Sequence, residues 1–103
     1  MAAKRRAVPV PGSVWSALGP IPVVLVKELK DEKGEPLLGC WEVGSRVISV
    51  REGMDPTAML ATIAHEWVHA MLSDAGVKLP HDTEETIADA LGTAIAGDVL
   101  SHL

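Results

Sequence analysis

The segment from Asp55 to Gly76 constrains the fold of this chain most strongly, because it carries helix-boundary signals around a long apolar pattern. Asp55 is placed to cap the free amide groups of a helix, and Pro56 suits the first helical position, where a missing N–H costs nothing. Gly76 suits the position just past the helix end. The apolar residues that recur at helical spacing in between are Met59, Leu60, Ile63, Trp67, Val68, Met71 and Leu72. They occupy more than one side of the helix, so we expect it to be largely buried.

Apolar and β-branched stretches before this helix predict a small sheet. Residues 21–29, 37–43 and 46–51 have strand character. The charged residues 30–36 predict a hairpin connection between the first two strands, and the glycine-first pair Gly44-Ser45 suits a tight type II′ turn between the last two. We therefore expect an antiparallel sheet of about three strands.

A second helix is predicted from about residue 83 to residue 101. Its expected packing residues are Ile87, Ala88, Leu91, Ala94, Ile95 and Val99. Strands followed by helices indicate an α+β fold with two packed helices. At 103 residues we expect one domain, residues 21–103, preceded by an irregular segment, residues 1–20, that is rich in Pro, Gly and Ala.

Charge and composition exclude several classes of protein. The formal net charge is −5 and the sequence has no basic stripe beyond the short run Lys4-Arg5-Arg6, so no nucleic-acid partner is expected. No stretch of about 18 uninterrupted apolar residues exists, so we expect no membrane span. Pro9 and Pro11 interrupt any signal-peptide helix, and Cys40 has no second cysteine to pair with. These features favour a cytoplasmic protein, whose oligomeric state stays open.

The first helix contains His65-Glu66-Trp67-Val68-His69. Residues four apart project from the same helix face, so His65 and His69 can bind one ion. Zinc accepts neutral histidine nitrogen, and catalytic zinc usually has three protein ligands and one open position. Glu66 is rotated by about 100° from His65, which can bring its carboxylate beside that open position as a general base. Because such groups are costly to bury without partners, the motif predicts a zinc site.

A third ligand is expected after the first helix. The position six residues after His69 is Ala75, which excludes a third histidine there. The remaining candidates are His81, Glu84, Glu85 and Asp89. Glu85 and Asp89 are four apart, so both can face the first helix, Glu85 as ligand and Asp89 as acceptor for a histidine N–H.

Two alternatives stay open at this point. Residues 82–85 also match a capping box, with Asp82 at the N-cap, Glu85 at N3 and Glu84 as a solvated acid. His81 is an alternative ligand, or a hydrogen-bond donor to the oxyanion of the tetrahedral intermediate.

The run Glu85-Thr-Ile-Ala-Asp89-Ala-Leu-Gly92-Thr93-Ala-Ile95 resembles the glutamate-bearing helix of the gluzincins, the thermolysin-like zinc peptidases. The chain is also similar to minimal, phage-encoded members of this kind, over roughly residues 45–97. The resemblance implies that Glu85 is the third zinc ligand and that Asp89 orients a zinc-bound histidine. The chain departs from the family in the short spacing of sixteen positions between His69 and Glu85 and in having no tyrosine for the oxyanion. Gly92 would let the two helices approach closely.

These features together predict a zinc metallopeptidase, an endopeptidase more than an exopeptidase, with Glu66 as general base. We expect a peptide or protein substrate to lie extended along an exposed sheet edge, for which residues 47–51 are the expected strand. Trp41 and Trp67 are expected to pack in the core. The alternatives are a catalytically weak or inactive zinc-stabilised binding module, and a purely structural domain.

Overall fold

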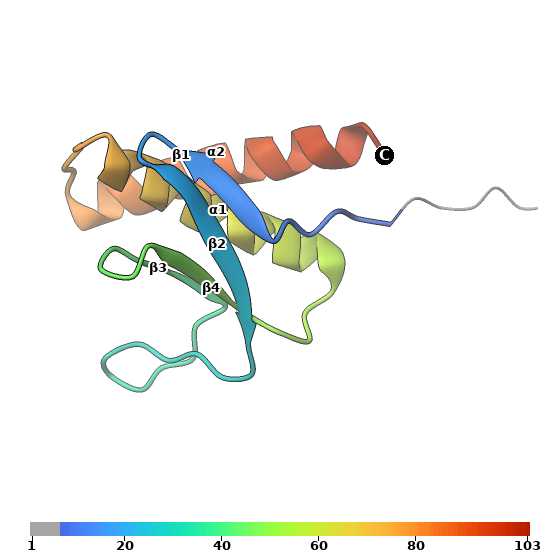
Figure 1. The fold of residues 1–103 in the computed structure, drawn as a ribbon, viewed down its shortest axis with the longest axis horizontal. Coiled ribbons are helices and arrows are strands. Elements are labelled where there is room, and N and C mark those ends of the chain that lie inside the picture. The colour runs from blue at the N-terminus through green and yellow to red at the C-terminus, as the bar shows by residue number, and fades with distance from the viewer. Residues whose placement is uncertain (1–6) are drawn as a thin grey trace, which may run out of the picture.

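The computed structural model describes residues 7–103, in which a four-stranded sheet is covered by one helix and a second helix packs on the first (Figure 1). The elements are β1 (Ser13–Ser16), β2 (Gly19–Val26), β3 (Gly39–Glu42), β4 (Val47–Arg51), α1 (Pro56–Asp74) and α2 (His81–Ser101). Helix α1 packs on the sheet, and α2 packs on α1. The α+β class with two packed helices is confirmed. No helix within residues 7–103 is long and apolar enough to cross a membrane.

The sheet is mixed and has the strand order β1-β2-β4-β3. β1 pairs antiparallel with β2, and β3 pairs antiparallel with β4, but β2 and β4 run parallel, with Val23 opposite Ile48. The expected three-stranded antiparallel sheet is therefore wrong in strand number and direction. Residues 30–36 do bend back locally, with Lys30 bridging Pro36, but β4 then inserts between β2 and β3 and separates them.

Strand β1 lies within the segment expected to be irregular, so that expectation is wrong for residues 13–16. Val14 is buried and pairs with Ile21. Pro20 and Pro22 lie in the part of β2 that precedes its pairing with β4. At alternate positions of an antiparallel pair the N–H groups point away from the partner, so these prolines remove no ladder hydrogen bond. Residues 1–6 lie outside the described part of the chain.

The β3–β4 connection also differs from the expected type II′ turn. It spans four residues, and the residue with a positive φ is Arg46, at 53°, whereas Gly44 has none. The Arg46 guanidinium makes two hydrogen bonds to the Asp74 carboxylate, of 2.6 and 3.1 Å. This ion pair to the end of α1 accompanies the left-handed conformation of Arg46.

Helix α1 is buried on two sides, as its apolar pattern predicted. One core cluster lies between α1 and the sheet and consists of Val14, Ile21, Ile48, Val50, Met59, Ile63 and Ala70. A second lies between the helices and consists of Leu60, Ala64 and Ala96. The helix boundaries also follow the sequence signals: Asp55 accepts hydrogen bonds from the N–H groups of Thr57 and Ala58, and Gly76 follows the helix with a φ of 71°.

Helix α2 begins two residues earlier than expected. Its N-cap position is occupied by Pro80, with no side-chain cap, and Asp82 lies within the first turn. The capping-box interpretation of residues 82–85 is therefore wrong. The carboxylates of this first turn are free for other contacts.

Candidate metal centre

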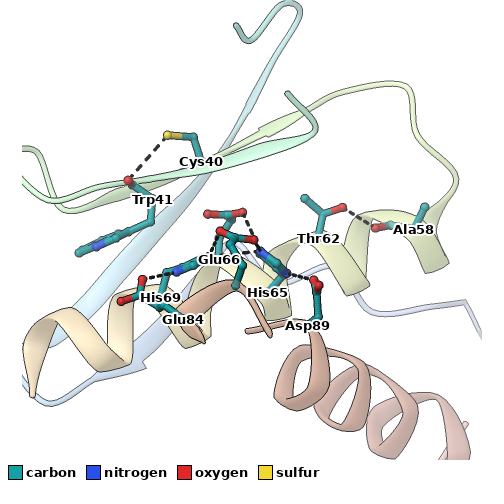
Figure 2. Close-up of polar contacts among 10 residues, drawn as sticks. Cys40, Trp41, Ala58, Thr62, His65, Glu66, His69, Glu84 and Asp89 are labelled. Atoms are coloured by element: carbon teal, nitrogen blue, oxygen red, sulfur yellow. Dashed lines mark hydrogen bonds and ion pairs between the residues drawn. The ribbon is translucent and has the colours of Figure 1, made fainter. Parts of the chain in front are cut away.

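The side chains of His65 and His69 of α1 lie close together below the strand that carries Cys40 and Trp41 (Figure 2). Glu85 of α2 brings its carboxylate to both of them. His65 Nε2 lies 3.2 Å from His69 Nε2 and 3.2 Å from one carboxylate oxygen of Glu85, whose other oxygen lies 2.9 Å from His69 Nε2. Atoms bound tetrahedrally to one zinc at about 2.0–2.1 Å are separated by roughly 3.3 Å. The three side chains could therefore hold one metal ion with little movement.

The outer nitrogen of each histidine contacts a further carboxylate. Asp89 lies 3.0 Å from His65 Nδ1, as the sequence predicted for one of the histidines. Glu84 contacts His69 Nδ1 at 2.5 Å. A carboxylate at Nδ1 fixes the histidine tautomer and leaves Nε2 unprotonated for a metal. Both rings are therefore oriented for binding.

The role of Glu84 differs from the solvated first-turn acid weighed in the capping-box alternative. The buried residues of α2 are Ala88, Gly92 and Ala96, spaced by four along the line that faces α1. Glu84 lies one turn before Ala88 on this line, so the pattern of small residues was a signal for its position.

Gly92 sets the distance between the helices at the site. A Cβ atom there would lie 2.9 Å from both the Cα and the N of His65. These are backbone atoms that cannot rotate away, so only glycine allows this approach. The close crossing brings Glu85 and Asp89 within reach of the histidines.

Glu66 faces the same space but stands further from the histidines, with 4.0 Å between its carboxylate and His65 Nε2. Burial raises the pKa of Glu66 and the nearby Glu85 acts in the same direction, while His65, His69 and a backbone hydrogen bond from Trp41 lower it. Its side chain is only 12% exposed. This position beside the cluster suits a proton-transfer group more than a fourth ligand.

His81 lies apart from the cluster. It is the first residue of α2 and is exposed, and it makes no side-chain hydrogen bond or ion pair with any residue of the described range 7–103. The structure therefore does not bring this alternative ligand and oxyanion candidate to the site.

Strand β3, not β4, forms the sheet edge beside the site. The expectation that residues 47–51 are the exposed edge is wrong, because β4 lies between β2 and β3. Arg51 donates its N–H to the carbonyl of Leu38, so the backbone groups of Gly39 and Trp41 face away from β4. A Cβ on Gly39 would lie 3.2 Å from Cγ of Glu66, which shows how closely this edge approaches α1.

Two hollows flank the cluster along β3. One has a volume of about 330 Å³ and is lined by residues that include Leu38, Gly39, Thr62, Glu66, Asp89 and Thr93. The other has a volume of about 350 Å³ and is lined by residues that include Trp41, Val43, His69, Val77, Lys78 and Leu79. The cluster of His65, His69 and Glu85 therefore lies in a cleft that continues on both sides.

Comparison of the chain with protein-family models, with curated proteins and with solved structures gives no match.

Proposed function

We propose that this protein is a zinc-dependent endopeptidase. The observation that carries the proposal is the convergence of His65, His69 and Glu85, with ligand atoms within 4.8 Å of one another, beside a buried carboxylate that is not part of that set. Two imidazoles and one carboxylate are a donor set typical of catalytic zinc. The carboxylate of Glu66 supplies the acid–base group that such a centre needs for hydrolysis.

The reaction requires an activated water and a proton for the leaving amine. Zinc in this position would polarise the scissile carbonyl and lower the pKa of a bound water. Glu66 accepts the proton of the attacking water and delivers it to the amine nitrogen as the peptide bond breaks. The Glu66 side chain is only 12% exposed, so bulk water competes little for these proton transfers.

The substrate lies extended along β3. The backbone groups of Gly39 face the open edge, next to the Trp41 N–H that donates to Glu66, and a peptide added along this edge continues the sheet through main-chain hydrogen bonds. The two hollows then lie on either side of the scissile bond. This arrangement supports an endopeptidase, because the cleft continues in both directions from the centre.

The resemblance to gluzincins supports Glu85 as a zinc ligand and Asp89 as the acceptor for a histidine N–H. The absence of tyrosine supports an alternative function. With no tyrosine in the sequence and His81 outside the cluster, the chain lacks the side chains that larger members direct at the oxyanion. The alternative is a zinc-stabilised binding module with little or no turnover.

The decisive experiment compares wild type with Glu66→Gln on an unfolded protein substrate, with the zinc content of both measured. Glutamine keeps the shape of the side chain but cannot accept the proton, so hydrolysis is expected to fall by at least about 100-fold while one zinc per chain is retained. Equal, metal-independent cleavage in both proteins would reject the proposed peptidase activity. Zinc binding without cleavage in either would favour the binding module.

A further inference from the structure

The hollow between β3 and the connection from α1 to α2 has no part in the proton transfers described above. It opens beside His69. Its apolar lining consists of Trp41, Val43, Val77 and Leu79, and Ser73, Lys78 and Glu84 add polar groups at its walls. We infer, resting on the proposed function, that this hollow receives an aliphatic or aromatic side chain of the substrate, on the amino-terminal side of the bond that is cut.

The apolar character of the occupant follows from the exposure of the walls. Val43 is 64% exposed and Val77 is 40% exposed. A single exposed valine needs no explanation, but these two come from separate connections and line the same hollow, next to an indole. A side chain that covers them removes apolar surface from water.

The position relative to the scissile bond follows from Glu66. This residue lines the opposite hollow, next to Gly39, and does not line the hollow beside His69. A group that protonates the leaving amine must lie within hydrogen-bond reach of that nitrogen, which belongs to the residue after the scissile bond. The residue after the bond therefore lies on the Glu66 side, and the residues before it extend past His69.

Trp41 is held in a fixed position as a wall of this subsite. The Arg46 guanidinium lies 5.7 Å from the centre of the Trp41 ring. Arg46 is itself fixed by its two hydrogen bonds to Asp74, whose side chain is 3% exposed. A wall that does not need to be ordered on binding gives better discrimination between side chains.

The inference is tested by mapping cleavage sites in a proteome-derived peptide mixture by mass spectrometry, with the zinc-loaded protein. Wild type is expected to enrich aliphatic and aromatic residues at one position before the cut. In paired synthetic peptides with Leu or Ser at that position, Val77→Asp is expected to reduce the preference for Leu at least tenfold in kcat/KM. The matched control is Val24→Asp on β2, which is also 40% exposed but lies outside the cleft and is expected to leave the preference unchanged.

The other possible outcomes separate the subsite from the proposed function. If Val77→Asp lowers zinc content or the melting temperature, Val43→Asp serves in its place, because its side chain is more exposed. Cleavage without a positional preference would overturn the subsite and leave the proposed function standing. Enrichment of acidic residues that disappears in Lys78→Met would show that charge sets the specificity, which also overturns the inference. Absence of any zinc-dependent cleavage by wild type would reject the proposed function and the subsite with it.

Discussion

At the scale of single residues, the carboxylates of the site differ in which histidine nitrogen they contact and at what distance. Glu85 lies against both Nε2 atoms, Asp89 and Glu84 each contact one Nδ1 atom, and Glu66 stands apart from both rings. Four acids around two histidines repel one another without a cation between them, which favours a divalent ion at this place.

Glu84 and Asp89 are predicted to tune zinc affinity through the histidines they contact. Glu84→Gln and Asp89→Asn are each expected to weaken zinc binding by about 10–100-fold, because the substituted amide holds the ring less firmly and lowers the basicity of Nε2. Asp82→Asn is the matched control, since this exposed acid lies in the same helical turn without a side-chain contact to either histidine. Competition with a chromogenic chelator measures all three. If Glu84→Gln binds zinc as tightly as the control variant, Glu84 has no role in zinc binding.

His81 is predicted to have no part in metal binding. His81→Ala is expected to bind zinc as tightly as wild type, because the residue is exposed and stands outside the cluster. Glu85→Ala, by contrast, is expected to lose most of the affinity, since it leaves only two protein ligands. The same chelator competition measures the zinc affinity of both variants. A loss of zinc affinity in His81→Ala would show that His81 is a ligand.

Much of the site could be predicted from the sequence, because the spacing of residues along a helix fixes which side chains share a face. His65 with His69 and Glu85 with Asp89 were found in this way. Glu84 was placed less well, since its contact depends on how α2 crosses α1, and the crossing follows from buried small residues such as Gly92.

At the scale of elements, the crossing of α1 and α2 is the feature that brings the two halves of the site together. The helices touch closely where Gly92 meets the backbone of His65. Any atom added there pushes against backbone and separates the carboxylates of α2 from the histidines.

Gly92→Ala is predicted to destabilise the fold by about 1–3 kcal/mol, as overpacking of a tight contact does, and to weaken zinc binding. Gly97→Ala is the matched control on the same helix, because a Cβ there meets nothing within 4 Å. In that variant the better helix propensity of alanine is expected to stabilise the protein by about 0.5–1 kcal/mol. Urea unfolding measures both changes. Stabilisation by both substitutions would contradict the packing argument.

The ion pair between Arg46 and Asp74 connects the β3–β4 connection to the end of α1 and is predicted to make stability depend on pH. The hydrogen bonds from Arg46 are the main cause that lowers the pKa of Asp74 from 3.8 to about 2. Because the pKa is lowered in the folded state, this stabilisation is complete above the ordinary pKa and is lost as the pH falls from 3.8 towards 2.

The test compares the melting temperatures of wild type and Arg46→Gln between pH 7 and pH 2. The difference between them is expected to be largest near neutral pH and to shrink in the acid range as Asp74 takes up a proton. Lys30→Gln is the control, since its contact with Glu28 joins two exposed side chains and is expected to contribute little at any pH. A difference for Arg46→Gln that is constant over the whole range would refute the coupling.

The elements differed in how far their sequences determined them. The ends of α1 were predicted correctly because Asp55 and Gly76 act on the nearest backbone groups. The parallel pairing of β2 with β4 was not predicted. It joins residues such as Val23 and Ile48, which are separated by a long connection, so no local sequence signal indicates that they pair. β1 was missed because its residues lie in a stretch rich in Pro, Gly and Ala, a composition typical of irregular segments.

At the scale of the whole molecule, a metal ion bound at the proposed site is expected to contribute a large part of the stability. A chain of 103 residues builds only a small core, here divided into two clusters on either side of α1. The packing of α1 against α2 also places several carboxylates around His65 and His69. When no cation is bound, the repulsion between these carboxylates offsets part of the free energy gained by packing.

Chelation of the metal is therefore predicted to lower the melting temperature substantially. Free zinc at 100 times its dissociation constant stabilises the folded state by about 2.7 kcal/mol, and roughly 1 kcal/mol corresponds to about 4–8 °C in a domain of this size. Calorimetry with and without EDTA is thus expected to show a difference of more than about 10 °C under these conditions. In His69→Ala the difference is expected to disappear, because one ligand is lost, whereas His102→Ala, changed at an exposed histidine near the C-terminus, is expected to keep it. An equal response to EDTA in the two variants would mean that the ion binds elsewhere in the chain.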